Sequence, residues 1–256
     1  MNYKGILFFL GIYSLFISFF SFLNILYSNY FNFSLDLNSY LITLIISLTI
    51  GIFFYFLGKN YNKNISLSDQ IILIILSFIF LPLLISVPYN LSIYDINFIN
   101  SYFESVSGFT VTGFSIIDNI REIDEPLLLW RSSSQWLGGL FFLIATIGTL
   151  GSKQVRIKPN YLLSGFTSGG NFYNNFNYNF IRILFIYTLT TIFIFLTYSI
   201  SDIRILDSLH LAFTVISSGG FLPKNNLSNV INNDFQILIL SITLLFPIFN
   251  FYLLFK

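Results

Sequence analysis

The sequence predicts an all-α polytopic membrane protein in which two helix–pore helix–helix repeats follow two leading transmembrane helices. Composition is the first observation: 55% of the 256 residues are hydrophobic, 20% are aromatic and only 9% are charged, which excludes an ordinary soluble surface. The second observation is that two short runs of glycine and hydroxyl residues, at 105–115 and 216–221, interrupt the apolar sequence. Each run follows a short amphipathic segment and precedes a long apolar segment, so one unit occurs twice.

Two long uncharged segments, 5–27 and 37–58, begin the chain. Each is long enough to cross about 30 Å of hydrocarbon, which takes roughly 20 helical residues. Lys4 resembles the basic end of a signal peptide. The apolar run that follows is long, however, and no Ala-x-Ala-like cleavage site ends it, so we expect a retained membrane helix.

A third span is expected at 70–88, with Asp69 just before it and Ser66 or Ser68 as its N-cap. Pro82 is expected to kink this helix. The remaining spans are expected at 126–150, 183–201 and 235–255.

The segment 95–109 is different, because it is amphipathic and offers only about 14 helical residues, or about 21 Å at 1.5 Å per residue. It is too short to span the membrane. We expect a re-entrant pore helix that is capped by Asp95 and hands over to the run 110–113. A second pore helix is expected at 207–215. Aligning Gly113 with Gly220 gives a repeat offset of 107 residues, 220 less 113.

The two glycine and hydroxyl runs are predicted to form the narrow part of a pore. Non-helical backbone occurs at membrane depth only where protein buries it or where it lines a watery path. Potassium channels replace the ion's hydration shell with carbonyls of such a loop, and glycine permits the backbone angles that aim them. The alternative is a Gly/Ser-rich kink between helices, which has no reason to recur in both repeats. The predicted ion-binding residues are Thr110, Val111, Thr112 and Gly113 in the first run and Ser217, Ser218, Gly219 and Gly220 in the second.

Basic residues predict a cytoplasmic N-terminus, because they gather in the loops that would then lie inside. The inside residues would be Lys4, Lys59, Lys63, Lys153, Arg156, Lys158, Arg182 and Lys256, and the outside residues Arg121, Arg131, Arg204 and Lys224. Both pore helices then enter from the outer face and aim the negative ends of their dipoles at the membrane centre. The outer carboxylates, among them Asp95, Glu104, Asp118 and Glu122, either attract cations or form a solvated rim.

Two segments, Ser-Tyr-Phe-Glu-Ser-Val-Ser-Gly-Phe-Thr-Val-Thr-Gly-Phe at 101–114 and Leu-Trp-Arg-Ser-Ser-Ser-Gln-Trp-Leu-Gly-Gly at 129–139, resemble the Trk/Ktr/HKT potassium transporter family. The second is the more specific, because bacterial Trk-type proteins open the helix after their first filter loop with a nearly identical motif. Their second repeat carries a Ser-Thr-Gly-Gly-Phe-like loop where this chain has 217–221. The similarity covers about 71–255, and the two leading spans resemble the extra amino-terminal pair of the bacterial Trk branch.

The resemblance implies four repeats in a pseudo-fourfold array, with one filter glycine in each. Gly113 and Gly220 match two of these glycines, and nothing in the chain matches the third and fourth repeats, which hold the family's gating loop. The chain would then form half of a potassium-channel-like pore. Since a half-pore exposes filter backbone to lipid, we expect a homodimer or a second half-pore subunit, or a gene that is truncated or split relative to its relatives.

The expected function is potassium uptake across the bacterial inner (plasma) membrane by a multi-pass, half-size subunit with a carbonyl-lined filter. The alternative is a non-conducting structural or regulatory subunit, a remnant of a Trk-type transporter. An enzyme is not expected, since the spans hold no His, Asp or Glu cluster for acid–base or metal chemistry. We expect no catalytic residues, no covalently bound cofactor and no metal beyond the potassium substrate.

The expected partners are the lipid bilayer, the completing half-pore and, from the resemblance, a cytosolic nucleotide-binding regulatory ring, although the loop 151–179 lacks the acidic and arginine pattern expected for docking it. A net charge of +1 argues against nucleic acid. Four parts are expected: the leading helices at 1–64, the first repeat at 65–158, a cytoplasmic Asn/Gly-rich linker at 159–179 and the second repeat at 180–256.

Assignments of burial or contact for five residues also follow from the sequence. Arg131 is expected either to pair with carboxylates at the outer rim or, as the commoner case, to lie at the interface with its charged end in water. Trp130 and Trp136 are expected in the aromatic belt. Glu104 is expected to hydrogen-bond neighbouring backbone amides. His210 is expected to be a packed, hydrogen-bonded residue.

Overall fold

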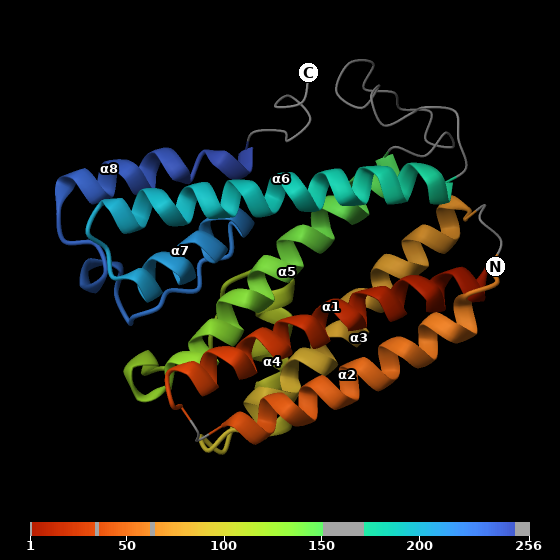
Figure 1. The fold of residues 1–256 in the computed structure, drawn as a ribbon, viewed down its shortest axis with the longest axis horizontal. Helices are drawn as coiled ribbons and strands as arrows, with labels where there is room; N and C mark the ends of the chain where they lie inside the picture. Colours follow the sequence, from red (N-terminus) through yellow and green to blue (C-terminus); the bar gives the residue numbers. More distant parts are fainter. Residues whose placement is uncertain (1, 34–35, 62–64, 151–171, 249–256) are drawn as a thin grey trace.

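The computed structural model describes residues 2–33, 36–61, 65–150 and 172–248, and all regular structure in these ranges is helical. The eight α-helices are α1 (Tyr3–Tyr30), α2 (Leu37–Gly58), α3 (Leu67–Asn90), α4 (Phe98–Phe109), α5 (Glu125–Leu150), α6 (Phe172–Ile200), α7 (Ile205–Ser217) and α8 (Asp234–Thr243) (Figure 1). Within the described residues, α1, α2, α3 and the 180–200 part of α6 are long and apolar enough to cross a membrane. The predicted all-α polytopic membrane fold is confirmed.

Helices α1 and α2 form a tight antiparallel hairpin. A Cβ atom added to Gly11 would lie 2.7 Å from the Tyr55 backbone nitrogen, and one added to Gly58 would lie 2.5 Å from the Phe8 nitrogen. Glycine therefore lets the two backbones approach, as small residues do between membrane helices. At the other end of the hairpin, Ser21 Oγ donates to the Tyr40 carbonyl at 2.7 Å.

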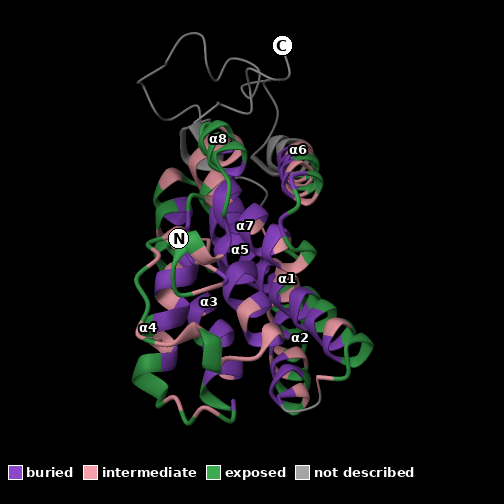
Figure 2. Cartoon of the chain, turned by 90° about the vertical axis from the view of Figure 1, so that its left-hand side faces the viewer, coloured by how far each residue is buried: buried purple, intermediate pink, exposed green. Residues whose placement is uncertain are grey.

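Helix α5 is the centre of the molecule. It contacts α1, α3, α4, α6 and α7, and in Figure 1 it runs between the group of α1 to α3 and the group of α6 to α8. Figure 2 shows α5 and α7 as largely buried, whereas α2 and α8 carry many exposed residues. The two short helices α4 and α7 therefore share one neighbour, and that neighbour positions both of the loops that follow them.

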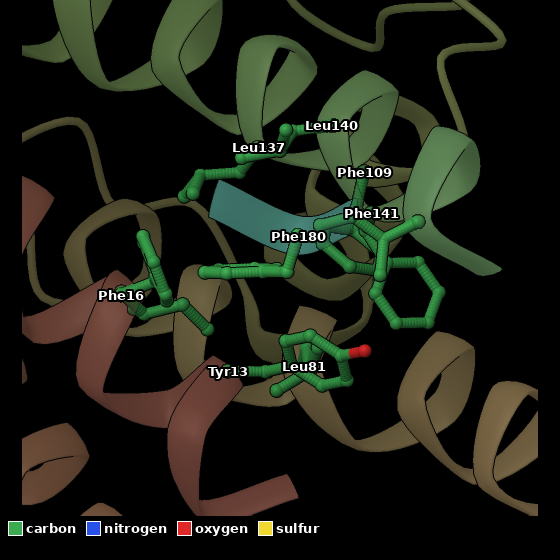
Figure 3. A pocket seen from close by; sticks show the side chains of 10 residues that line it. Tyr13, Phe16, Leu81, Phe109, Leu137, Leu140, Phe141 and Phe180 are labelled. Carbon is green, nitrogen blue, oxygen red and sulfur yellow. The ribbon is translucent and has the colours of Figure 1, made fainter. Parts of the chain in front are cut away.

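A small apolar cavity of about 20 Å³ lies where the leading hairpin meets the repeats (Figure 3). Edge-to-face aromatic pairs close around it: Tyr13 with Phe141 at a ring-centroid distance of 4.9 Å and Phe16 with Phe180 at 5.7 Å. Such pairs stabilise packing beyond the area they bury. The hairpin is thereby packed against both α5 and α6.

Several expected boundaries differ from the structure. Helix α4 begins later than expected, because Asn97 caps it by accepting the Asn100 N–H at 2.8 Å. The predicted cap at Asp95 is wrong, since that residue has a φ of +49° and lies outside the helix. Helix α3 is capped as expected by Ser66, whose hydroxyl accepts the Asp69 N–H at 3.2 Å.

The later helices differ as well. Helix α6 begins at Phe172, so residues 172–179 of the expected linker are helical, while 159–171 lie outside the described residues. Helix α8 ends at Thr243 and a 3₁₀ turn follows at Phe246–Ile248. The expected single helix at 235–255 is therefore shorter in the described part, and 249–255 lie outside it.

Two buried carboxylates lie near the start of α5, and one of them, Asp36, ties the leading hairpin to the first repeat. Asp36 Oδ1 accepts the Ile93 N–H at 3.0 Å, the Tyr94 hydroxyl donates to Asp124 Oδ1 at 3.3 Å, and the Asp124 N–H donates to the Tyr94 oxygen at 2.7 Å. Burial raises the pKa of both carboxylates, and the charge of Asp36 adds to the effect on Asp124, whose pKa rises to about 6.

We expect these carboxylates to make stability depend on pH. A carboxyl with a raised pKa binds its proton more tightly in the folded state, so its contribution to stability is lost as pH rises from about 4 to about 6. Asp124→Asn should flatten this dependence, measured as melting temperature against pH in detergent. The exposed Asp118→Asn is the matched control. Equal slopes in the wild type and both variants would contradict the assignment.

Candidate ion-binding loops

The first loop leaves the carboxyl end of α4 at Phe109 and turns sharply. Val111 has a φ of +60° and Gly113 a φ of +82°. Ser107 holds the turn, because its carbonyl accepts the Thr112 N–H at 3.0 Å and its hydroxyl donates to the Phe114 carbonyl. A β-branched residue in the left-handed region is strained, and such strain persists where the surroundings impose it.

The second loop has the same geometry at the offset of 107 residues. Ser218 has a φ of +63° and Gly220 a φ of +82°. Thr214 takes the place of Ser107: its carbonyl accepts the Gly219 N–H at 2.8 Å and its hydroxyl donates to the Phe221 carbonyl at 2.7 Å. The two loops are therefore alike in backbone angles and in hydrogen bonds, not only in sequence.

Most of the predicted filter carbonyls are free. In the described part of the chain, the carbonyls of the first loop at 110–113 accept no hydrogen bond, and neither do those of Ser217, Ser218 and Gly220. The exception is Gly219, which is buried and whose carbonyl accepts a hydrogen bond from the Gln135 side chain at 2.7 Å. Unpaired carbonyls at the end of a helix dipole are ligands for a cation.

A cavity of about 300 Å³ adjoins the start of both loops. Its walls include the first residues of each loop together with residues of α3, α5 and α6. The lining residues include Thr110, Val111, Ser217, Ser218, Gly138 and Gly139. The cavity places hydroxyl groups and loop backbone at one site although the two loops are far apart in sequence.

Two glycines of α5 bring this helix against both pore helices. A Cβ atom on Gly138 would lie 1.9 Å from the Phe109 carbonyl oxygen at the end of α4. One on Gly139 would lie 2.8 Å from the Ser217 Cβ at the end of α7. Neighbouring residues of one helix thus contact the ends of both pore helices, and a larger side chain at either position would push a loop away.

The polar residues before these glycines connect α5 to its neighbours. The Trp130 indole N–H donates to the Ile85 carbonyl at 2.9 Å, and the Trp136 indole N–H donates to Thr191 Oγ1 at 3.0 Å. Both tryptophans are buried, so the expected place in the interface belt is wrong: their N–H groups find partners on α3 and α6 instead. Ser132 bonds His210 Nδ1 at 2.9 Å, which makes His210 the packed residue expected.

Arg131 is also buried rather than interfacial, with 2% of its side chain exposed. Its guanidinium pairs with Glu104 of α4 at 2.9 Å, donates to Ser115 Oγ at 3.0 Å and stacks 4.3 Å from the Phe221 ring centroid. Glu104 in turn accepts the Ile116 N–H at 3.1 Å, a backbone hydrogen bond of the kind expected for it. The ion pair therefore joins the first pore helix, the exit of the first loop and the second loop.

Some known proteins resemble this chain over part of their length. No family model matches the chain. The chain is 28% identical over 228 residues to an uncharacterized cation transporter of Methanocaldococcus jannaschii, covering 84% of this chain and 45% of that protein. It is 38% identical over 74 residues to the Trk system potassium uptake protein TrkI of Halomonas elongata, or 29% of this chain and 14% of that one. The chain is a relative of the Trk-type transporters.

The fold agrees with this relationship. The crystal structure of the potassium transporter TrkH from Vibrio parahaemolyticus superposes with a TM-score of 0.79 at 20% identity, covering 96% of this chain and 49% of that one. The chain thus spans about half the length of the Trk-type proteins it matches. The matched proteins are named as transporters or uptake proteins, and the described residues hold no group of three His, Asp or Glu that could bind a metal.

Proposed function

We propose that this chain is a subunit of a potassium uptake system whose two loops supply part of a carbonyl-lined selectivity filter. The observation that carries the proposal is the pair of loops with nearly equal positive φ angles at matching positions and mostly unpaired carbonyls. Carbonyl oxygens in such an arrangement replace the hydration shell of a potassium ion. Thr110–Gly113 and Ser217–Gly220 are the proposed filter segments, and no covalently bound cofactor takes part.

A second half of the pore is part of this proposal. Thr110, Thr112, Ser218 and Gly220 are exposed, and Phe114 has 70% of its surface exposed. Exposed loop backbone is unfavourable in lipid. This favours a partner subunit, or another copy of the chain, that covers the exposed residues of the two loops. The relatives of about twice this length support the same arrangement. A cytosolic nucleotide-binding ring is proposed as the partner on the inner face.

The proposed membrane orientation places the N-terminus in the cytoplasm of a bacterial cell. The beginnings of α1 and α3 lie together, because the Asn2 N–H donates to Asp69 Oδ1 at 3.0 Å. Lys4 and Lys59 lie at this same end, since a Cβ on Gly58 would be 2.6 Å from the Lys4 carbonyl. Basic residues gathered at one end favour that end as the inner side.

Growth of a potassium-uptake-deficient bacterium on low potassium tests the proposed function. We expect rescue by the chain alone, if two copies close the pore, or by the chain with the product of the adjacent gene. Immunoblotting of membranes verifies insertion, and the empty vector is the control. Inserted protein without rescue in either arrangement would instead support a non-conducting structural or regulatory subunit.

A further inference from the structure

We propose that Gln135 is a positioning residue that determines ion specificity by holding the Gly219 carbonyl away from the ion path. The inference rests on the proposed function, and it assigns a role to a side chain outside the loops themselves. As a consequence, the two filter loops present different sets of carbonyls to the ion although their backbones are alike.

Gln135 makes two hydrogen bonds to the second loop. Its Nε2 donates to the Gly219 carbonyl at 2.7 Å, and its Oε1 accepts the Phe221 N–H at 3.2 Å. The same Oε1 lies 3.1 Å from the Thr214 hydroxyl oxygen, whose proton is donated to the Phe221 carbonyl. The Gln135 side chain is fully buried. A buried amide with one donor and one acceptor in use fixes both the position and the direction of the backbone that it contacts.

The Gly219 carbonyl is confined from two sides. On one side it accepts a hydrogen bond from Gln135. On the other side, its oxygen lies 2.2 Å from the position that a Cβ atom on Gly113 would take. A larger residue at 219 would displace the amide, because its Cβ would lie 2.3 Å from the Gln135 amide carbon. The carbonyl is therefore packed between α5 and the first loop.

The first loop lacks this restraint. Thr112 stands at the position equivalent to Gly219, it is exposed, and its carbonyl accepts no hydrogen bond among the described residues. The difference arises from α5, which offers the Gln135 amide to the second loop only. Specificity in a carbonyl filter depends on the number and placement of its oxygens, so the restraint affects ion preference directly.

The test compares rubidium and sodium flux in vesicles carrying the complete transport-competent assembly. Gln135→Met keeps the length of the side chain but removes both polar atoms, so the Gly219 carbonyl loses its donor. We expect the rubidium-to-sodium flux ratio to fall at least threefold. Trp136→Phe is the matched control, because it removes a buried hydrogen bond of the next residue, to Thr191, without touching either loop. Its ratio should equal that of the wild type.

A second variant keeps the test decisive if Gln135→Met does not reach the membrane. Gln135→Glu has the same size and retains an acceptor; when protonated it also donates to Gly219, so its ratio should rise toward that of the wild type as pH falls. If the wild type transports selectively and the inserted variants show the wild-type flux ratio at every pH, the role of Gln135 is overturned. The proposed function is not affected by that outcome. Absence of rubidium flux in the wild-type assembly would contradict the proposed function instead.

Discussion

Gly113→Ser is expected to lower the rubidium-to-sodium flux ratio by roughly tenfold, and Gly220→Ser to lower it less. Both glycines have a φ of +82°, so either serine strains the backbone. Only Gly113 is also in close contact, since a Cβ there would lie 2.2 Å from the Gly219 carbonyl oxygen, whereas nothing lies within 4 Å of a Cβ on Gly220. A tenfold change corresponds to about 1.4 kcal/mol, comparable to one displaced carbonyl.

Paired flux measurements in vesicles with equal amounts of each variant would check this order. Gly51→Ala is the control, because its Cβ would meet the Leu15 side chain inside the leading hairpin at 2.9 Å, far along the chain from both loops. It should change packing and leave the ratio unchanged. A normal ratio in Gly113→Ser at normal abundance would contradict the filter assignment.

The second large effect is expected from the ion pair between Glu104 and Arg131. Glu104→Gln leaves the Arg131 guanidinium buried without a counter-charge, which costs about 3–5 kcal/mol in comparable buried pairs. The melting temperature in detergent should fall sharply, and rubidium flux should fall with it because the pair supports the exits of both loops.

The matched control is Glu125→Gln, which removes a carboxylate from the partly exposed pair with Arg204. Surface pairs contribute about 0–1 kcal/mol, so its melting temperature should stay close to that of the wild type. The double variant Glu104→Gln with Arg131→Met should recover part of the loss, because no buried charge remains. Equal effects of Glu104→Gln and Glu125→Gln would show that the buried pair has no special role.

The helices and the repeat could be predicted because their signals are local or periodic. Uncharged segments of about 20 residues have few alternatives to crossing a membrane, and the pairing of Gly113 with Gly220 needed only an alignment of the chain with itself. Helix α5 was expected as a span at 126–150 and is a helix at Glu125–Leu150. It is not among the most apolar described helices, because its polar residues serve the two loops.

The supports of the loops could not be predicted, since they join residues that are distant in sequence. The sequence leaves Arg131 either paired with a carboxylate at the outer rim or extended into water, and only the fold shows that it is buried beside Glu104. Gln135 does carry a signal in the sequence, because a glutamine inside a span must satisfy its amide within the protein. The cap of α4 at Asn97 rather than Asp95 is a smaller case, because both residue types cap helices and local sequence does not choose between them.

The most direct test of the filter assignment is to locate rubidium by anomalous scattering in crystals of the assembled transporter. We expect rubidium peaks coordinated by carbonyl oxygens of the first loop, Thr110–Gly113, and by those of Ser217, Ser218 and Gly220 in the second, with the Gly219 carbonyl still bonded to Gln135. Rubidium bound elsewhere in the protein, with both loops unoccupied at concentrations that support transport, would contradict the assignment.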